Sequence, residues 1–271
     1  MVAFVSLSPG EASWTILLPL KDLARAKSRL RRPDRSRLAL AMALDTVCAV
    51  LASAADLVGA VVVVTNDRTV RQALTRLRDV GDAGALPDGP TPPAAAIPTS
   101  ADPASPTPAS PTPASPVLPA WMRERLRVIP DVPDHGLNPA LVHGAVLADR
   151  WRPGRPLAAM SADLPALRTA ELRRALLEAA HHARAVLADA TGTGTVLLTA
   201  AAGQPLEPAF GVDSHAAHRR SGAVDLTAAL GATVPGLRRD VDTVEDLAEA
   251  AFLGVGDATA AALDPRRILT S

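Results

Sequence analysis

The chain has 271 residues, of which 48% are hydrophobic, enough to bury one large core. Lys plus Arg and Asp plus Glu number 28 each, so no net charge favours a general nucleic-acid or membrane-surface binder, and any anion site must come from local clustering. Aromatic residues make up 2% and Tyr is absent, which excludes stacking of single-stranded bases. The single cysteine, Cys48, excludes an internal disulfide and a cysteine metal cage.

The ends and apolar runs of the sequence favour a cytoplasmic protein. No apolar run approaches the roughly 20 residues that span a bilayer. The start of the chain lacks the basic-then-apolar order of a signal peptide, and we expect residues 1–12 to be a flexible tail. A reducing cytoplasm also suits the lone cysteine, so we predict a protein without membrane or nucleic-acid partners.

The first half of the chain alternates between strand and helix patterns. Trp14–Leu20 is an apolar run of strand length, and Asp34–Ala54 has helical spacing. Val61–Thr65 is a β-branched run typical of a strand covered on both faces, and Asp67–Leu77 is helical again. This order predicts an α/β fold of the doubly wound class, with a mostly parallel central sheet flanked by helices.

Residues 81–119 interrupt this alternation. They hold 12 of the 25 prolines, and Ala104–Pro108 repeats directly as Ala109–Pro113. Such a Pro/Ala/Ser-rich segment can build no core, so we predict a disordered insertion that serves as a spacer, with a polyproline partner arm as the alternative. Because strands and helices resume afterwards, residues 13–271 are predicted to form one domain that this insertion interrupts.

An acidic residue follows a strand pattern in the second half of the chain. Leu126–Ile129 predicts a strand, and a helix begins near Asn138, which is either its N-cap or a ligand contact. The apolar run at Leu157 ends at Asp163, before a helix predicted over Glu171–His182. Ligands of open α/β sheets bind at the carboxyl ends of strands, so Asp163 is a candidate metal ligand; a helix-entry Asp is the alternative.

Two segments offer donors to anions. Six basic residues follow the first strand, which suits a triphosphate or else forms a solvated basic face: Lys21, Arg25, Lys27, Arg29, Arg31 and Arg32. After an apolar run that ends at Asp189, residues 191–195 read Thr-Gly-Thr-Gly-Thr, whose backbone N–H groups could approach a phosphate closely. A simple turn between strands is the alternative for this Gly/Thr segment.

Two polar stretches close the chain. Residues 210–222 combine possible helix-start donors with two arginines, which favours anion binding. Asp240 and Asp242 are spaced i and i+2 and would project to one side if the segment is extended after a short strand. Either Asp242 or Thr243 could instead cap the closing helix, Val244–Leu253.

Together these features favour phosphoryl or nucleotidyl transfer. Asp163, Asp240 and Asp242 would supply the oxygen ligands that Mg²⁺ prefers, and the basic run and the Gly/Thr segment would supply anion donors around them. In such reactions the protein mainly positions the reactants and neutralises charge.

Several motifs, in collinear order over nearly the whole chain, resemble one enzyme family. They are Leu18-Pro19-Leu20-Lys21, Ala26-Lys27-Ser28-Arg29-Leu30, Ser161-Ala162-Asp163-Leu164-Pro165-Ala166-Leu167, Gly192-Thr193-Gly194-Thr195, Phe210-Gly211-Val212-Asp213-Ser214, His218-Arg219-Arg220-Ser221-Gly222 and Asp240-Val241-Asp242-Thr243. They closely resemble the phosphoenolpyruvate/2-phospho-L-lactate guanylyltransferases that act in the biosynthesis of the deazaflavin coenzyme F-420. The insertion at residues 81–119 is longer and richer in proline than this family would suggest.

The resemblance implies a single nucleotidyltransferase domain with a GT-A-like, Rossmann-like sheet. The implied reaction joins GTP to phosphoenolpyruvate, gives enolpyruvyl-diphospho-5′-guanosine and releases pyrophosphate. Its implied residue roles, carried over motif by motif, cover four sets. They are catalysis by Lys21, Lys27 and Asp163; phosphoenolpyruvate binding by Thr195, Gly211 and Ser214; nucleotide binding by Lys21, Lys27, Thr65 and Asn138; and Mg²⁺ binding by Asp163, Asp240 and Asp242.

Alternatives remain open at this point. The acceptor could be 2-phospho-L-lactate or 3-phosphoglycerate, because a single contact can distinguish acids that differ at one carbon. A sugar or molybdopterin-type nucleotidyltransferase usually carries a Gly-rich, Arg-containing loop where this chain has Leu18-Pro19-Leu20-Lys21. A non-enzymatic alternative is a Pro-rich interaction protein on an inactive domain. The resemblance also suggests a partner, the downstream transferase that takes up the labile product.

Overall fold

The computed structural model describes residues 13–23, 27–30, 32–79 and 118–264. The predicted tail at 1–12 and nearly all of the predicted insertion lie outside the described residues. At the end of that insertion, Leu118 is buried in the main core, and Pro119 directly precedes helix α3 (Ala120–Arg123). The domain therefore resumes two residues before the predicted boundary.

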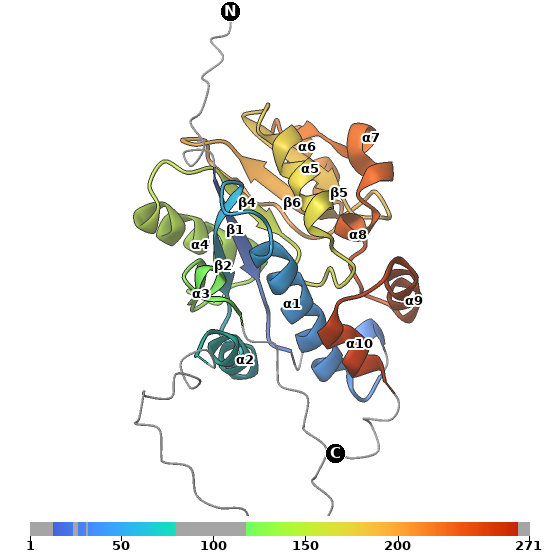
Figure 1. Ribbon diagram of the computed structural model, residues 1–271. Coiled ribbons are helices and arrows are strands. Elements are labelled where there is room, and N and C mark those ends of the chain that lie inside the picture. Colours follow the sequence, from blue (N-terminus) through green and yellow to red (C-terminus); the bar gives the residue numbers. More distant parts are fainter. Residues whose placement is uncertain (1–12, 24–26, 31, 80–117, 265–271) are drawn as a thin grey trace, which may run out of the picture.

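A seven-stranded sheet forms the centre of the molecule (Figure 1). Its order is β3-β2-β1-β4-β6-β5-β7. All pairs are parallel except those of β6, which runs antiparallel to both β4 and β5, because the short connection from β5 to β6 reverses the chain. The predicted α/β class with a mostly parallel sheet is confirmed. The strands are β1 (Trp14–Pro19), β2 (Val58–Val64), β3 (Leu126–Ile129), β4 (Leu157–Met160), β5 (Arg184–Ala188), β6 (Thr195–Ala200) and β7 (Val224–Asp225).

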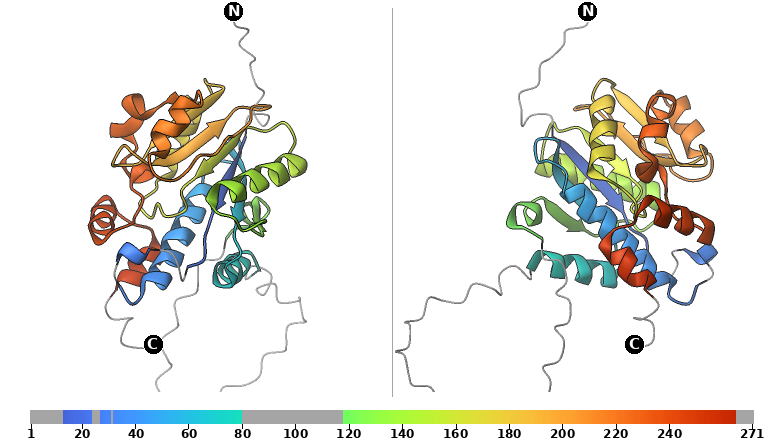
Figure 2. Two further views of the ribbon diagram at one scale, coloured as in Figure 1. Left: turned by 180° about the vertical axis from the view of Figure 1, so that it is seen from behind. Right: turned by 45° about the vertical axis from the view of Figure 1, so that its right-hand side comes forward.

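Helices cover both faces of this sheet. Helices α1 and α5 lie on one face, and the view from behind shows α4 and α6 on the other (Figures 1 and 2). The longer helices are α1 (Arg35–Leu51), α2 (Arg68–Asp79), α4 (Leu137–Trp151), α5 (Thr169–Ala179) and α9 (Val244–Leu253). The shorter ones are α6 (Ser214–Arg220), α7 (Thr227–Leu230), α8 (Pro235–Arg238) and α10 (Asp257–Leu263), with 3-10 turns at Ser28–Leu30 and Gly231–Thr233. Within the part of the chain described, no helix is long and apolar enough to cross a bilayer.

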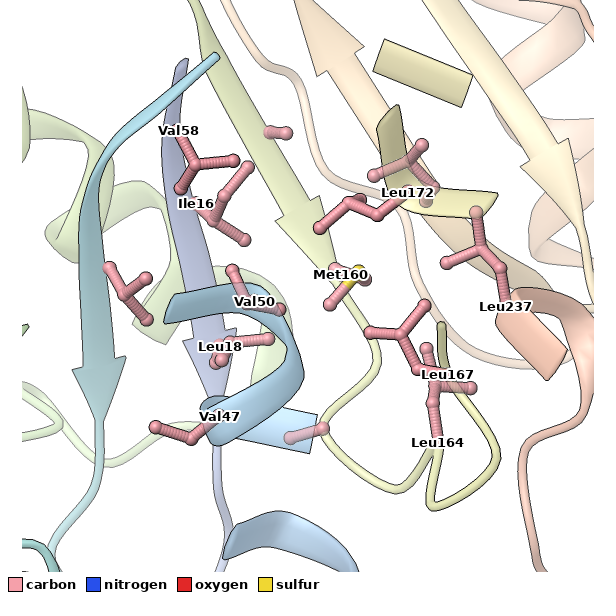
Figure 3. Packing of buried hydrophobic residues seen from close by; sticks show 14 of the residues in the cluster. Ile16, Leu18, Val47, Val50, Val58, Met160, Leu164, Leu167, Leu172 and Leu237 are labelled. Atoms are coloured by element: carbon pink, nitrogen blue, oxygen red, sulfur yellow. The ribbon is translucent and has the colours of Figure 1, made fainter. Parts of the chain in front are cut away.

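The alternation of side chains along β1 explains why the sheet needs helices on both sides. Ile16 and Leu18 pack with Val47 and Val50 of α1 in the largest apolar cluster (Figure 3). Leu17 points to the opposite face and joins a second cluster with residues of α4. Successive strand residues face opposite sides, so a strand that is apolar throughout must be covered twice.

A third cluster joins the outer side of α1 to the end of the chain. Leu38 and Met42 of α1 pack with Leu247 of α9 and Ala262 of α10. The Asp45 carboxylate also accepts hydrogen bonds from the backbone N–H groups of Ala258 and Thr259 at the start of α10. No pattern in the sequence predicted α10, which is short and is held mainly by these tertiary contacts.

The segment before Asp240 differs from the prediction. A short strand was expected there, but α8 ends at Arg238 and no strand follows in this described region. Pro235 begins that helical turn, where its fixed φ and missing N–H are tolerated. The closing helix α9 begins as predicted, and Thr243 is its N-cap in a capping box with Asp246.

Candidate active site

The candidate residues meet at one edge of the sheet. Strands β1 and β4 are parallel and end at this edge, while the antiparallel β6 begins there. The backbone N–H of Ser161, just after β4, donates to the carbonyl of Val196 in β6 at 2.9 Å. Lys21 after β1, Asp163 after β4 and Thr195 at the start of β6 therefore lie on the same side of the molecule, as predicted for ligand binding in an open α/β sheet.

Lys27 joins two of the predicted metal ligands. Its ammonium donates to the carboxylate of Asp163 and, at 2.8 Å, to Oδ1 of Asp242. Only 8% of the Lys27 side chain is exposed. Burial alone would lower the pKa of this amine, but the two carboxylates outweigh burial and raise it. Lys27 therefore stays charged, and its backbone has a positive φ of 56°.

Asp240 lies among other carboxylates. Burial raises its pKa to about 7, and the charges of Asp163, Asp189 and Asp242 act in the same direction against the opposing effect of Lys27. Such an accumulation of negative charge favours a cation. Across the described residues, no group of three or more His, Cys, Asp or Glu side chains is arranged to hold a metal, and Lys27 is bonded to two of the acids.

Backbone contacts hold the Asp240–Asp242 segment against the sheet. The N–H of Val241 donates to the carbonyl of Asp163 at 3.3 Å, and the N–H of Ala190 donates to the carbonyl of Arg238 at 2.8 Å. Val241 itself is fully buried. These contacts bring acids from two distant parts of the sequence together, although no strand forms there.

A cleft of about 400 Å³ opens beside these residues. Its lining includes the charged residues Lys21, Lys27, Asp163 and Asp242. Phe210 and Leu137 supply an apolar wall. The cleft thus combines cationic, anionic and apolar groups, as a site for a charged organic substrate requires.

The Gly/Thr segment is built around Asp189. Oδ1 of this buried carboxylate accepts hydrogen bonds from the N–H groups of Gly192 and Thr193, at 2.7 and 3.0 Å. A Cβ on Gly194 would lie 2.5 Å from Oδ2 of Asp189, so only glycine permits the close approach. Two of the N–H donors that the sequence offered to a phosphate are therefore used within the loop. Thr195, which follows, is buried, and its hydroxyl lies 3.0 Å from a ring nitrogen of His218.

Gly211 and Ser214 lie in the connection between β6 and α6. Gly211 has a φ of 140°, which favours glycine, and Ser214 is the first residue of α6. Asn138 holds this connection in place: its amide donates to the carbonyl of Phe210 at 3.0 Å and accepts from the N–H of Phe210 at 2.8 Å. The predicted helix cap at Asn138 is wrong, because Gly136 is the N-cap of α4.

Thr65 and Lys21 differ in their access to a ligand. Thr65 is fully buried and its hydroxyl accepts from the N–H of Asp67 at 3.1 Å. Lys21 is exposed and lines the cleft. Lys21 is thus free to reach a nucleotide phosphate, whereas Thr65 offers a ligand little surface.

One buried polar residue received no role from the sequence. His218 of α6 is fully buried and lies between Thr195 and Ala209, with a ring nitrogen 3.0 Å from Oγ1 of Thr195. The sequence placed His218 in one of the family motifs without a role, and its i, i+3 spacing from His215 puts both histidines on one side of a helix. That spacing alone does not distinguish a buried histidine from an exposed one.

Comparisons with known proteins identify the family. No family model matches the chain. The chain is 61% identical over 263 residues to the phosphoenolpyruvate guanylyltransferase of Frankia casuarinae, which covers 97% of this chain and 81% of that protein. It is 46% identical over 255 residues to the phosphoenolpyruvate guanylyltransferase of Streptomyces scabiei, covering 92% of this chain and 95% of that one.

Among solved structures, a nucleotidyl transferase from Methanothermobacter thermautotroptrophicus aligns with a TM-score of 0.49 and 17% identity, covering 89% of this chain and 97% of the other. The predicted family is confirmed: the chain belongs to the phosphoenolpyruvate guanylyltransferases, a family of nucleotidyltransferases.

Proposed function

We propose that this chain joins GTP to phosphoenolpyruvate, giving enolpyruvyl-diphospho-5′-guanosine and pyrophosphate, in coenzyme F-420 biosynthesis. The observation that carries this proposal is the pairing of Lys27 with Asp163 and Asp242 at the cleft. A cation and acids at the carboxyl ends of strands suit a nucleoside triphosphate and its metal ion. The names of the relatives supply phosphoenolpyruvate and the transfer of a guanylyl group.

Asp163, Asp240 and Asp242 would hold Mg²⁺. Their oxygens are the hard ligands that this ion prefers, and the raised pKa of Asp240 reflects, after burial, the repulsion among carboxylates that a cation would relieve. Asp163 and Asp242 would then exchange their bonds to the Lys27 ammonium for bonds to the metal ion. When bound, Mg²⁺ would neutralise charge on the triphosphate and orient it.

The reaction itself needs little from the protein beyond positioning. An oxygen of the phosphoenolpyruvate phosphate attacks the α-phosphorus of GTP in line, and the bond from the α-phosphorus to the bridging oxygen breaks. Pyrophosphate leaves with the electron pair. The attacking phosphate is already ionised near neutral pH, so no general base is required. Lys21 and Lys27 would stabilise the charge that develops on the leaving pyrophosphate.

The acceptor would bind beside the Gly/Thr segment. Thr195 would offer its hydroxyl, Gly211 its backbone N–H, and Ser214 its hydroxyl at the start of α6 to the phosphate and carboxylate oxygens. The two hydrogen bonds between the Asn138 amide and the backbone of Phe210 support this proposal, because they fix the segment that leads into Gly211.

The proposed nucleotide contacts differ in their exposure to a ligand. Thr65 and Asn138 remain predictions for the nucleoside; their positions favour structural roles, since Thr65 is buried and both polar atoms of the Asn138 amide bond Phe210. Lys21 and Lys27 are the better candidates for the nucleotide because both line the cleft. A downstream transferase that takes up the labile product, in the cytoplasm, completes the proposal.

Pyrophosphate release tests this function directly. Purified protein with Mg²⁺ and GTP is compared with phosphoenolpyruvate, 2-phospho-L-lactate, 3-phosphoglycerate and no acceptor. Release with phosphoenolpyruvate alone is the expected result. Release with another acid would assign a different acceptor. If none is released, even with the downstream transferase present to capture a labile product, the proposed reaction is wrong.

Asp163→Ala serves as the matched variant in this assay. We expect turnover to be lost while the far-ultraviolet circular dichroism stays close to that of the wild type, and the thermal midpoint to fall only modestly, because Lys27 loses one of its two carboxylate partners and keeps Asp242. Full activity in Asp163→Ala would contradict the metal-binding role.

A further inference from the structure

His218 connects the strand that carries Thr195 to the loop that carries Gly211. Its side chain is fully buried, and both ring nitrogens have partners. Nδ1 lies 3.0 Å from Oγ1 of Thr195, and Nε2 accepts a hydrogen bond from the backbone N–H of Ala209 at 2.8 Å. Its ring also meets the ring of Phe210 edge-on, with centroids 5.1 Å apart and an interplanar angle of 70°.

These partners determine where the imidazole carries its proton. A backbone N–H can only donate, so Nε2 must be the bare acceptor nitrogen. Burial, together with the charges of Arg184 and His215, lowers the pKa of His218 to about 4, so the ring is neutral near neutral pH. A neutral ring with a bare Nε2 carries its proton on Nδ1, and Nδ1–H therefore donates to Thr195.

The direction of this bond determines what Thr195 can do. A threonine hydroxyl has one proton to donate and can accept through its lone pairs. Because Oγ1 accepts from His218, its own proton is free for another acceptor, and the bond from His218 limits the rotation of the hydroxyl. An anionic oxygen, which can only accept, is the ligand that this arrangement favours.

We propose that His218 is a positioning residue that orients the Thr195 hydroxyl as a hydrogen-bond donor to an anionic oxygen of the acceptor substrate. This inference rests on the proposed function, in which Thr195 binds phosphoenolpyruvate. His218 also ties Ala209, two residues before Gly211, to the same strand. One imidazole thus sets the relative position of two groups that would hold the acceptor, without touching the substrate.

Two substitutions each remove one of the two hydrogen bonds of the imidazole and keep the other. A glutamine amide can place an oxygen near the Nε2 position, so His218→Gln keeps an acceptor for Ala209 and loses the donor to Thr195. An asparagine amide can place an N–H near the Nδ1 position, so His218→Asn keeps the donor and loses the acceptor. His215→Gln is the matched control, because His215 is a neighbouring buried histidine of α6 that lies 3.1 Å from the Asp225 carboxylate.

Steady-state kinetics give the first readout. His218→Gln should raise KM for phosphoenolpyruvate about tenfold, as the loss of one well-placed hydrogen bond predicts, while KM for GTP stays within about twofold. His218→Asn should raise KM for the acceptor less, and His215→Gln should leave it unchanged. Combined with Thr195→Val, His218→Gln should cause no further increase, because the hydroxyl that it orients is already gone.

The ring nitrogens give a second readout that does not depend on activity. In ¹⁵N-labelled protein without substrate, the His218 resonances should report a protonated Nδ1 and a bare Nε2 from about pH 5.5 to 8. A proton on Nε2, or a charged ring in this range, would overturn the inference. An unchanged KM for phosphoenolpyruvate in His218→Gln, with an active wild type, would also overturn it. If the wild type releases no pyrophosphate, the proposed function fails, and the nitrogen resonances still decide the tautomer.

Discussion

At the scale of single residues, Lys27 balances the charge of the acids beside the cleft. Lys27→Met keeps most of the side-chain volume and removes the ammonium that bonds Asp163 and Asp242. Without a divalent cation, we expect the variant to lose about 1–2 kcal/mol of unfolding free energy, because the facing carboxylates lose their shared partner. Thermal or urea unfolding in the presence of a chelator measures this loss.

Mg²⁺ should stabilise Lys27→Met more than it stabilises the wild type. Its thermal midpoint should rise more on addition of Mg²⁺ than that of the wild type, since the ion would no longer compete with the ammonium for the carboxylates. Lys21→Met is the matched control, because Lys21 lines the same cleft but is exposed. Equal responses of Lys27→Met and the wild type to Mg²⁺ would count against Asp163 and Asp242 as metal ligands.

His218 should make stability depend on pH. Its pKa is lowered from 6.5 to about 4 by burial, with Arg184 and His215 acting in the same direction. Between these two values the unfolded chain binds a proton that the folded chain does not, so the free energy of unfolding falls as the pH falls. For a fully buried side chain this contribution is on the order of 3 kcal/mol.

The unfolding free energies of the wild type and His218→Gln can be compared at each pH. Their difference isolates the contribution of His218, because the carboxylates titrate in both proteins. The wild type should be the more stable protein near neutral pH, and its advantage in unfolding free energy should shrink as the pH is lowered through this window. Urea unfolding at a series of pH values gives the difference directly. An advantage that stays constant would mean that the folded state also accepts the proton.

The sequence predicted the types of residue in the site better than their partners. Asp163, Asp240, Asp242 and Lys27 were all expected near the substrates, and the structure brings them together. The bond from Lys27 to Asp163 joins residues 136 positions apart, and no local pattern reports such a pair. Asn138 is a second example: its position suggested that it caps its own helix, but its hydrogen-bond partner is the distant Phe210.

At the scale of elements, α4 supports the loop that precedes α6. Both polar atoms of the Asn138 amide bond the backbone of Phe210, which lines the cleft one residue before Gly211. Asn138→Ala should therefore raise KM for phosphoenolpyruvate severalfold, while KM for GTP changes little, because the loop rather than the nucleotide loses its support. Initial rates with each substrate varied in turn measure the two constants.

Asn66 provides the matched control for this variant. Its amide makes the same pair of bonds to the backbone of Asp131, at 2.7 and 3.0 Å. Asn66→Ala should leave KM for phosphoenolpyruvate unchanged. An increase confined to the KM for GTP in Asn138→Ala would instead support the predicted contact of Asn138 with the nucleoside.

Sequence periodicity predicted the buried strands and the long helix α1. It failed where tertiary contacts determine the secondary structure. The apolar runs of β1, β2 and β3 and the helical spacing of α1 were recognised because their patterns are long or continuous. Helix α10 was missed, since a seven-residue Ala-rich segment has no distinctive pattern and depends on Asp45 for its start. The strand expected before Asp240 was wrong because Pro235 begins a helical turn instead.

At the scale of the whole molecule, the sheet topology assembles the site. Antiparallel β6 starts at the edge where β1 and β4 end, so acids, lysines and Thr195 from distant parts of the sequence meet there. Alternation of strands and helices predicted a parallel sheet, but could not predict that β6 inserts between β4 and β5. That strand order depends on which edges pair in three dimensions, and it determines the neighbours of Asp163.

Residues 84–115 should be dispensable for the fold and the reaction. The chain leaves the described domain after α2 and returns at Leu118. Contacts between α2 and the segment that begins at Leu118 hold these two points close together. Arg123 of α3 donates to the carbonyl of Arg78 in α2 at 3.3 Å, and Leu118 is buried in the same cluster as Leu74 and Leu77. The Pro-, Ala- and Ser-rich composition of the connection between these flanks predicts that it adds length without adding to the core.

Deletion of residues 84–115 should therefore leave KM for both substrates and kcat within about twofold of the full chain. The thermal midpoint should stay the same or rise slightly, because the entropy of closing a loop increases with its length, by only about 0.6 kcal/mol for each doubling. Scanning calorimetry and pyrophosphate release test both expectations on the same preparation. A loss of activity with an unchanged midpoint would show that the Pro-rich segment takes part in catalysis. A fall in the midpoint would show that it contributes to the packed domain.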